Sequence, residues 1–163
     1  MIKAQLKIDI RPVDKNNWRD VINLKVKENQ EKFIASNVKS IAQSKIFEDH
    51  FNFAIYCEEQ TAGYILYFFT LDNDNQIPNH LKQDNGSYTE IVRFMIDAKY
   101  QRKGIGSKAL HLLLGYLYDE HGSRTIWMSY IKENAISGNF FKNGGFQETE
   151  IEEKYEFVLK YEF

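Results

Sequence analysis

The feature that most constrains this chain is a glycine-containing loop between a predicted strand and a predicted helix. Residues 89–96 are rich in β-branched and aromatic side chains, which favours a buried strand, and apolar residues recur at helical spacing over 105–117. Between them lies Gln101-Arg102-Lys103-Gly104-Ile105-Gly106. Glycine allows the backbone to approach a ligand closely, and a helix N-terminus offers unpaired N–H groups at its positive end. With two cations added, the loop predicts a pyrophosphate site.

Glycines of this kind also occur in turns that bind no ligand. The prediction therefore depends on the position of the loop between a strand and a helix. A P-loop would contain G-K-[ST], and a dinucleotide-binding fold would contain G-x-G-x-x-G after its first strand. Neither motif is present, and the loop lies past the middle of the chain. The sequence therefore favours a phosphate-bearing ligand other than NAD or ATP.

Length and composition indicate one folded domain over residues 1–163. The apolar share of 43%, with 12 Phe and 10 Tyr, argues against a disordered chain. The 21 Lys and Arg do not exceed the 23 Asp and Glu, which gives no support to nucleic-acid binding. No apolar stretch approaches the roughly 20 residues of a spanning helix, and the N-terminus lacks a signal-peptide core. We therefore expect a cytoplasmic protein with no membrane partner.

The remaining chain alternates strand and helix patterns. Strands are expected at 6–13, 51–58, 63–70, 87–96, 125–130, 146–152 and 155–163, and helices at 14–29, 36–44, 105–121 and 137–143. Asp14 and either Ser36 or Asn37 are the expected caps of the first two helices. Residues 71–86 are polar and are expected to form a surface loop. Cys57, the only cysteine, is expected to be a buried thiol. This order predicts a mixed α/β (α+β) fold with helices against a sheet.

A second motif follows the predicted strand at 125–130. Glu133-Asn134-Ala135 comes directly after that strand, and the next helix ends in Phe140-Phe141-Lys142-Asn143-Gly144-Gly145-Phe146. Together with the glycine loop, this arrangement resembles the GCN5-related N-acetyltransferase (GNAT) superfamily. The resemblance covers most of the chain. Residues 24–37 also resemble the first helices of bacterial spermine/spermidine (diamine) acetyltransferases within that superfamily.

The resemblance implies a mostly antiparallel sheet whose two central strands splay apart and hold acetyl-CoA, as co-substrate, in the opening. The backbone of the first splayed strand would pair with the pantetheine arm like an added strand, which here corresponds to Phe94, Met95 and Ile96. The loop from Gln101 to Gly106, together with Ser107, would wrap the pyrophosphate through backbone N–H groups. No metal is implied.

Two positions in the second motif have an implied role beside an ordinary one. Asn134 matches the family's asparagine near the pantetheine and phosphates, and it could equally cap the following helix. Lys142 would contact the adenosine 3′-phosphate, or it could be a solvated lysine. The two readings of Asn134 are compatible with each other.

Acetyl transfer to an amine requires a neutral nucleophile, although alkyl amines have pKa values of roughly 10. A base, or a water chain leading to one, must therefore take a proton. Thr89-Glu90-Ile91-Val92 resembles the histone acetyltransferase branch of the family, whose catalytic glutamate stands at the position of Glu90. Glu90 is accordingly the predicted base, with a carboxylate on an exposed strand end as the alternative.

One position departs from the family pattern. Many members carry a tyrosine that can protonate the departing thiolate of CoA, and the matching residue here is Phe141, which has no proton to give. Either the thiolate leaves unassisted, since a thiol has a pKa of roughly 8.5, or another hydroxyl serves. Tyr130 and Tyr155 are the candidates by topology. Phe141 would then pack near the pantetheine sulfur.

The resemblance favours a small polyamine such as spermidine or spermine as the amine acceptor. Another amine (a protein N-terminus or lysine, an amino acid, an aminoglycoside) and a non-catalytic acyl-CoA-binding module are the alternatives. Carboxylates could hold a polycation, but glutamates that alternate along a strand are usually its solvated face, and none is assigned. The carboxylates considered are Glu28, Glu31, Asp72, Asp74, Asp84, Glu148, Glu150, Glu152 and Glu153.

Two further expectations concern metals and assembly. The four histidines form no metal-like spacing, so no metal site is predicted; they are His50, His80, His111 and His121. The last predicted strand, residues 155–163, carries alternating aromatic residues. That face could pair or pack against a second copy across a two-fold axis, which predicts a homodimer, or it could belong to the core.

Overall fold

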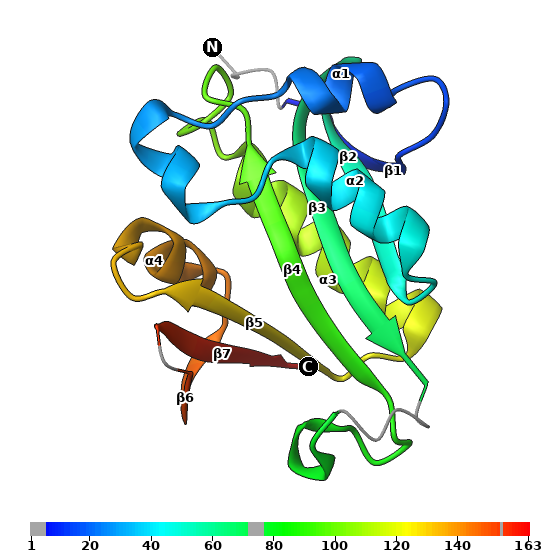
Figure 1. The fold of residues 1–163 in the computed structure, drawn as a ribbon, viewed down its shortest axis with the longest axis vertical. Helices are drawn as coiled ribbons and strands as arrows, with labels where there is room; N and C mark the ends of the chain where they lie inside the picture. The colour runs from blue at the N-terminus through cyan, green and yellow to red at the C-terminus, as the bar shows by residue number, and fades with distance from the viewer. Residues whose placement is uncertain (1–5, 72–76, 154) are drawn as a thin grey trace.

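The computed structural model describes residues 6–71, 77–153 and 155–163, and a seven-stranded sheet runs through it (Figure 1). The strands lie in the order β1-β2-β3-β4-β5-β7-β6, and every neighbouring pair is antiparallel except β4 and β5. This confirms the mixed, mostly antiparallel sheet. The strands are β1 (Ile8–Pro12), β2 (His50–Cys57), β3 (Gln60–Thr70), β4 (Tyr88–Ile96), β5 (Thr125–Ile131), β6 (Gln147–Glu153) and β7 (Glu156–Glu162).

Helices cover both faces of this sheet, as expected. In Figure 1, α1 and α2 lie in front of β2 and β3, and α3 lies behind the sheet. The helices are α1 (Trp18–Asn23), α2 (Asn37–Ile46), α3 (Ile105–His121) and α4 (Ala135–Asn143), with 3₁₀ turns η1 (Glu28–Phe33) and η2 (Asn79–Leu81). Among the described helices, none has the length and apolarity to cross a membrane.

The helix α3 forms because its apolar residues make one continuous buried stripe. Six of them pack against the sheet, namely Ile105, Ala109, Leu110, Leu113, Leu114 and Leu117. Gly104 before the helix and Gly122 after it have φ angles of 78° and 64°. This left-handed conformation strains residues with a side chain, so glycine suits both ends. Glycine thereby fixes where the helix begins, which is the edge of the predicted phosphate loop.

The predicted helix over 14–29 is wrong in both of its bounds. Asn17, not Asp14, precedes α1, and the Asp14 carboxylate instead accepts the N–H of Asn16 at 2.7 Å. The chain leaves the helix at Leu24 in an extended conformation. The cause is tertiary: the N–H of Lys25 donates to Asp97 Oδ2 at 2.9 Å, which ties this segment to the end of β4. The predicted cap Ser36 is confirmed, since its hydroxyl accepts the N–H of Lys39.

The two central strands separate after a short parallel pairing. Only Glu90 with Trp127 and Ile91 with Met128 are paired between β4 and β5. On the other side of β4 the register with β3 shifts, because Leu66 pairs with residue 93 and Tyr67 with residue 91. Such a bulge bends the strand and increases its twist. Beyond it β4 and β5 diverge visibly in Figure 1, which confirms the splayed arrangement.

The last strand does not lie at an edge of the sheet. β7 pairs with β5 on one side and with β6 on the other. The prediction that this strand could pair with a second copy is therefore wrong, because both of its hydrogen-bonding edges are used. Its central residue Leu159 is fully buried, which supports the alternative that the face belongs to the core. Cys57 is buried, as expected.

Candidate active site

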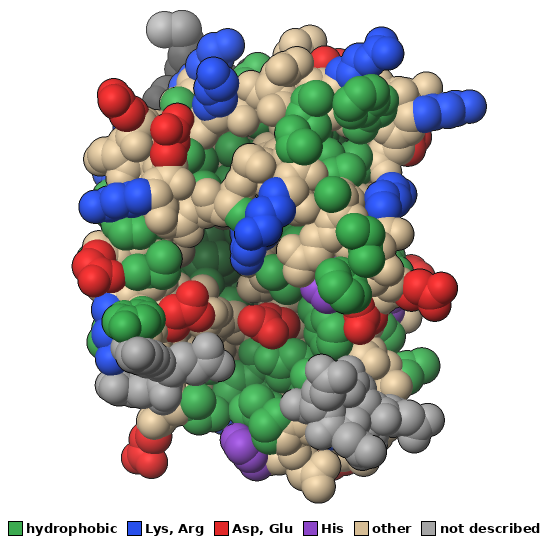
Figure 2. Space-filling view, viewed as in Figure 1, with side chains coloured by type: hydrophobic (Ala, Val, Ile, Leu, Met, Phe, Trp, Pro, Cys, Tyr) green, Lys and Arg blue, Asp and Glu red, His purple; other side chains and the backbone are tan. Residues whose placement is uncertain are grey.

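A cleft of about 930 Å³ lies where β4 and β5 separate. Its walls come from six segments: the connection between α1 and α2, β4, the glycine loop with the start of α3, β5, α4, and the start of β7. Figure 2 shows this face hollowed left of its centre, with hydrophobic side chains inside and Asp or Glu side chains along the lower side. The cleft can thus take a long ligand that is apolar along part of its length.

The β4 wall of the cleft consists of Ile91 to Ile96 and includes the predicted Phe94, Met95 and Ile96. Residues of β4 after Ile91 have no ladder partner on β5, so the edge of β4 that faces the cleft is unpaired in the sheet. An extended ligand can add to such an edge through main-chain hydrogen bonds. Phe94 packs against the rings of Phe140 and Phe141 at centroid distances of 5.5 and 5.9 Å, which joins β4 to α4 below the opening.

The glycine loop closes the upper end of the cleft and is held there by one glutamine. Gln101 Nε2 donates to the carbonyl of Ile96 at 2.9 Å and to Gln30 Oε1 at 2.8 Å. Arg102 has a φ angle of 64°, an uncommon conformation for a residue other than glycine. The first N–H groups of α3 have no carbonyl of the preceding turn to bond, and they carry the positive end of the helix dipole. The loop is therefore suited to an anion.

The loop residues divide between lining and supporting roles. Five of them line the cleft, namely Gln101, Arg102, Gly104, Gly106 and Ser107. Ile105 is 1% exposed and belongs to the core, and Lys103 donates its Nζ to the carbonyl of Lys99 at 2.7 Å. Neither of these two side chains is among the residues that line the cleft.

Residues from α4 form the wall opposite η1. Asn134 lines the cleft and also caps α4, since its Oδ1 accepts the N–H of Ser137 at 3.3 Å. The capping role is confirmed. Phe141 lines the cleft and is 3% exposed. Lys142 points elsewhere: its Nζ lies 2.8 Å from Glu148 Oε1, and this hydrogen bond raises the pKa of Lys142.

The predicted base lies at the closed end of the opening. Glu90 is half-buried, and its Oε2 accepts the hydroxyl of Tyr88 at 3.0 Å. Glu90 is not among the cleft-lining residues, which begin on β4 at Ile91. A carboxylate that the sequence did not single out, Glu156, does line the cleft, and it accepts the hydroxyl of Ser129 at 2.6 Å.

The chain matches the sequence profile of the acetyltransferase (GNAT) family over residues 18–146. This match spans the connection between α1 and α2, the glycine loop and α4, which are the segments that surround the cleft. The chain belongs to the GNAT family. The family resemblance drawn from the two motifs is thereby confirmed.

Curated relatives of this GNAT acetyltransferase include the spermine/spermidine N(1)-acetyltransferase of Bacillus subtilis. The two chains are 28% identical over 144 residues, which cover 87% of this chain and 89% of the relative. A probable spermine N(1)-acetyltransferase of Bacillus subtilis subsp. natto is 28% identical over the same shares of both chains.

Solved structures with the same fold include two that hold the coenzyme. The PaiA N-acetyltransferase of Thermoplasma acidophilum in complex with coenzyme A has a TM-score of 0.66 and 16% identity over 96% of this chain and 99% of that one. The Arabidopsis thaliana NAA60 structure in complex with acetyl-CoA has a TM-score of 0.71 and 14% identity over 96% and 99%. At these identities the similarity shows the GNAT fold.

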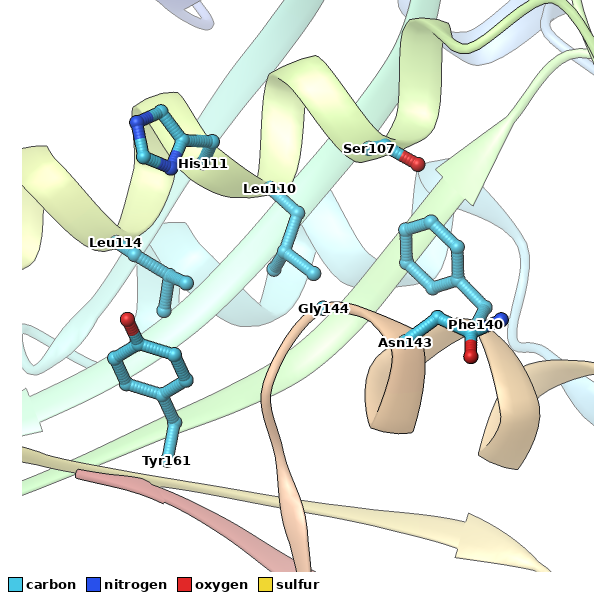
Figure 3. A pocket seen from close by; sticks show the side chains of 8 residues that line it. All are labelled: Ser107, Leu110, His111, Leu114, Phe140, Asn143, Gly144 and Tyr161. Carbon is cyan, nitrogen blue, oxygen red and sulfur yellow. The ribbon is translucent and has the colours of Figure 1, made fainter.

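A smaller hollow of about 250 Å³ continues from the cleft between α3 and α4 (Figure 3). It shares Ser107, Phe140 and Asn143 with the cleft. In Figure 3, Leu114 points from α3 toward Tyr161, whose hydroxyl points back toward α3, and Leu110 points toward Gly144. The sequence patterns gave no sign of this hollow, because its residues come from three elements that only the fold brings together. Its lining is Ser107, Leu110, His111, Leu114, Phe140, Asn143, Gly144 and Tyr161.

The remaining candidate residues of this GNAT acetyltransferase are distributed as follows. Tyr130 lines the cleft and lies against Gly138 of α4, whereas Tyr155 is 63% exposed at the turn before β7. His121 is half-buried at the end of α3: its Nε2 lies 3.0 Å from the hydroxyl of Tyr67, and burial lowers its pKa. Within the described ranges, no group of three or more His, Cys, Asp or Glu could hold a metal ion. Asp72 and Asp74 lie outside the described residues, as do the side chains of Glu152 and Glu153.

Proposed function

We propose that this GNAT acetyltransferase transfers the acetyl group of acetyl-CoA to a primary amine of a small polyamine such as spermidine or spermine. The observation that carries the proposal is the cleft itself, in which the unpaired edge of β4 leads to the N-terminus of α3. The polyamine acceptor is supported by the relatives at 28% identity, which are named as spermine or spermidine acetyltransferases.

Acetyl-CoA would lie along β4 with its phosphates at the loop. The pantetheine arm would pair with the backbone of Phe94, Met95 and Ile96, and the pyrophosphate would meet the N–H groups between Gly104 and Ser107. Arg102, exposed at the cleft, would add a positive charge. The contacts of Lys103 and Ile105 support a role in shaping the loop through the backbone.

The far end of acetyl-CoA has two candidate contacts. The smaller hollow adjoins the cleft at Ser107 and Phe140 and offers room beside the N-terminus of α3 for the adenosine. Lys142 stays a predicted contact of the 3′-phosphate, although it would first have to leave Glu148. Asn134 would reach the pantetheine while it caps α4.

In the chemical step, Glu90 would accept a proton from the acceptor ammonium, directly or through water. The nitrogen lone pair would then form the new C–N bond at the acetyl carbon as the C–S bond breaks, and CoA would leave as its thiolate. The nitrogen would lose its second proton to the thiolate or to water, which leaves a neutral amide. Phe141 is buried among aromatic rings and can supply no proton. The thiolate would leave unassisted or take a proton from a hydroxyl, of which Tyr130 is the one that lines the cleft.

One observation favours a second acceptor class, an amine that also carries a carboxylate, such as an amino acid or a peptide. Arg93 lines the cleft, and its buried Nε has no hydrogen-bond partner among the described residues. Its Nη1 donates to the carbonyl of Val92 at 2.7 Å. A carboxylate of the acceptor would satisfy the remaining N–H of this guanidinium.

The test is release of free thiol from acetyl-CoA with a panel of amines, namely spermidine, an amino acid and a lysine-containing peptide. Turnover with spermidine at the highest kcat/KM is the expected result. Turnover with the amino acid or peptide but not with spermidine would overturn the polyamine assignment. Binding of CoA by calorimetry without turnover on any amine would instead favour an acyl-CoA-binding module. Sedimentation of the same sample would test the homodimer, which stays a prediction.

A further inference from the structure

We propose that Glu156, held by Ser129, binds a second ammonium group of the acceptor and so selects diamines and polyamines over monoamines. This inference rests on the proposed function and adds to it the residue that would bind the second positive charge of the acceptor. Three properties of the cleft carry it: its charge distribution, the hydrogen bond that fixes Glu156, and the position of that residue relative to Glu90.

The charged side chains that line the cleft favour binding of a cation at one carboxylate. Among the described lining residues, the cationic groups are Lys32, Arg93 and Arg102, and Glu156 is the single carboxylate. Arg102 belongs to the phosphate loop, where a positive charge suits the coenzyme. An ammonium group that enters the same cleft is repelled by the cations and attracted to Glu156, and exclusion of water by the walls strengthens that attraction.

The carboxylate of Glu156 is fixed toward the cleft by one short hydrogen bond. Ser129 Oγ donates to Glu156 Oε2 at 2.6 Å, and both residues are half-buried. This bond occupies one carboxylate oxygen and restricts the orientation of the side chain. No described residue hydrogen-bonds the second oxygen, whose lone pairs can therefore accept from a ligand. Within the described part of the chain, no Lys, Arg or His forms an ion pair with Glu156.

Glu156 lies on the same face of the sheet as Glu90, farther toward the open end. Glu90 is paired with Trp127 on β5, and Ser129 follows Trp127 by two residues, so the two β5 side chains share a face. Two residues along a strand correspond to about 6.6 Å. Glu156 is paired with residue 131 and reaches back to Ser129. The two carboxylates therefore bracket the place where β4 and β5 begin to separate.

This arrangement matches an acceptor with two ammonium groups on a short aliphatic spacer. The reacting amine would lie beside Glu90 and the acetyl group, and the second ammonium would bind the free oxygen of Glu156. A monoamine would lack the second contact. Glu156 would thus act on acceptor selection, whereas proton removal would stay with Glu90.

The experiment compares kcat/KM for spermidine and for n-butylamine in the wild type, in Glu156→Gln and in the control Glu162→Gln. Gln keeps an oxygen for Ser129 but loses the negative charge, and Glu162 is exposed at the end of the same strand. We expect Glu156→Gln to lower kcat/KM about 10- to 100-fold for spermidine, the scale of a hydrogen bond to a charged group, and less than about 2-fold for n-butylamine. KM for acetyl-CoA should not change, and Glu162→Gln should match the wild type.

If Glu156→Gln lowered kcat/KM equally for spermidine and n-butylamine, or did not lower it for spermidine, the inference would be overturned. Calorimetric titration of spermidine into the CoA-saturated protein supplies a readout that needs no turnover, and Glu156→Gln should raise Kd by a similar factor there. If the wild type turns over no amine, the proposed acetyl transfer fails, but an unchanged Kd in the variant is what would refute the role of Glu156. The midpoint of urea unfolding checks that the variant is folded.

Discussion

The carboxylate of Glu90 lies at the point where β4 and β5 stop pairing, with Tyr88 as a hydrogen-bond donor at 3.0 Å. Replacement by glutamine keeps the shape and an acceptor for Tyr88 but removes the ability to take a proton. We therefore expect Glu90→Gln to lower kcat by about 10²-fold or more, the usual scale for the loss of a general base. Steady-state kinetics at saturating acetyl-CoA measures this.

The pH dependence separates a base from a residue that only supports the fold. If Glu90 is the base, the limb of the kcat/KM profile that reports proton removal from the acceptor should be lost in Glu90→Gln. A profile in the variant with the same limb as the wild type would assign the base elsewhere. Asp119→Asn, an exposed carboxylate on α3, is the matched control and should behave as the wild type.

At the scale of single residues, the sequence indicated a candidate role for Glu90, which stays a prediction, but it gave no indication of Glu156. Glu90 lies within the strand that leads to the glycine loop, so the residues that follow it in the sequence indicate its position in the sheet. Glu156 is 27 residues away from Ser129, its partner. Strand alternation predicts which residues share a face, but it does not predict which strand becomes the neighbour, and the neighbour decides whether a carboxylate meets solvent or a cleft.

At the scale of elements, α4 depends on a glycine in its interior. A Cβ on Gly138 would lie 2.4 Å from Cζ of Tyr130, which is too close for any real contact. Alanine favours a helix by about 1 kcal/mol over glycine, but overpacking costs about 1–3 kcal/mol. We expect Gly138→Ala to destabilise the protein by up to about 2 kcal/mol in urea unfolding, the overpacking cost less the gain in helix propensity. Because Tyr130 and α4 both line the cleft, acetyl-CoA should also bind more weakly.

Gly115 in α3 provides the matched control. A Cβ there would meet nothing within 4 Å, and the residue is exposed in the middle of the helix. Gly115→Ala should therefore stabilise the protein by about 0.5–1 kcal/mol through helix propensity alone. If both variants shifted the free energy of unfolding in the same direction, the close packing of Gly138 on Tyr130 would not determine the effect of Gly138→Ala.

The elements themselves could be predicted where local pattern and tertiary packing agree. The stripe of α3 is such a case, because the six apolar residues at helical spacing are all buried. The first helix is the opposite case. Its predicted span continued past Leu24, but a hydrogen bond from Lys25 to Asp97, 72 residues away, holds the chain in an extended conformation. No pattern within the helix itself carries that information.

At the scale of the whole molecule, the cleft exists because distant segments are fixed to one another. Gln101 bonds Gln30, 71 residues earlier, and this contact joins the glycine loop to η1. The sequence motifs predicted the β4 edge and the loop, which are adjacent in the chain. Of the wall formed by residues 26–35 the sequence indicated only Glu28 and Glu31, as carboxylates that could hold a polycation, and neither lines the cleft. That wall depends on contacts with β4 and the loop rather than on its own composition.

A ligand that contacts all of these segments should stabilise the fold as a unit. Binding to the native state alone adds RT ln(1 + [L]/Kd), or about 2.7 kcal/mol at a hundredfold excess over Kd. For a chain of 163 residues this corresponds to an increase in Tm of about 5–10 °C. We expect acetyl-CoA to produce this shift in thermal unfolding, in a single transition that moves with ligand concentration. Acetyl phosphate, which carries an acetyl group and a phosphate but neither pantetheine nor adenosine, is the control and should produce little change. An equal shift with acetyl phosphate would mean that the loop binds anions in general and that the β4 edge contributes nothing to coenzyme binding.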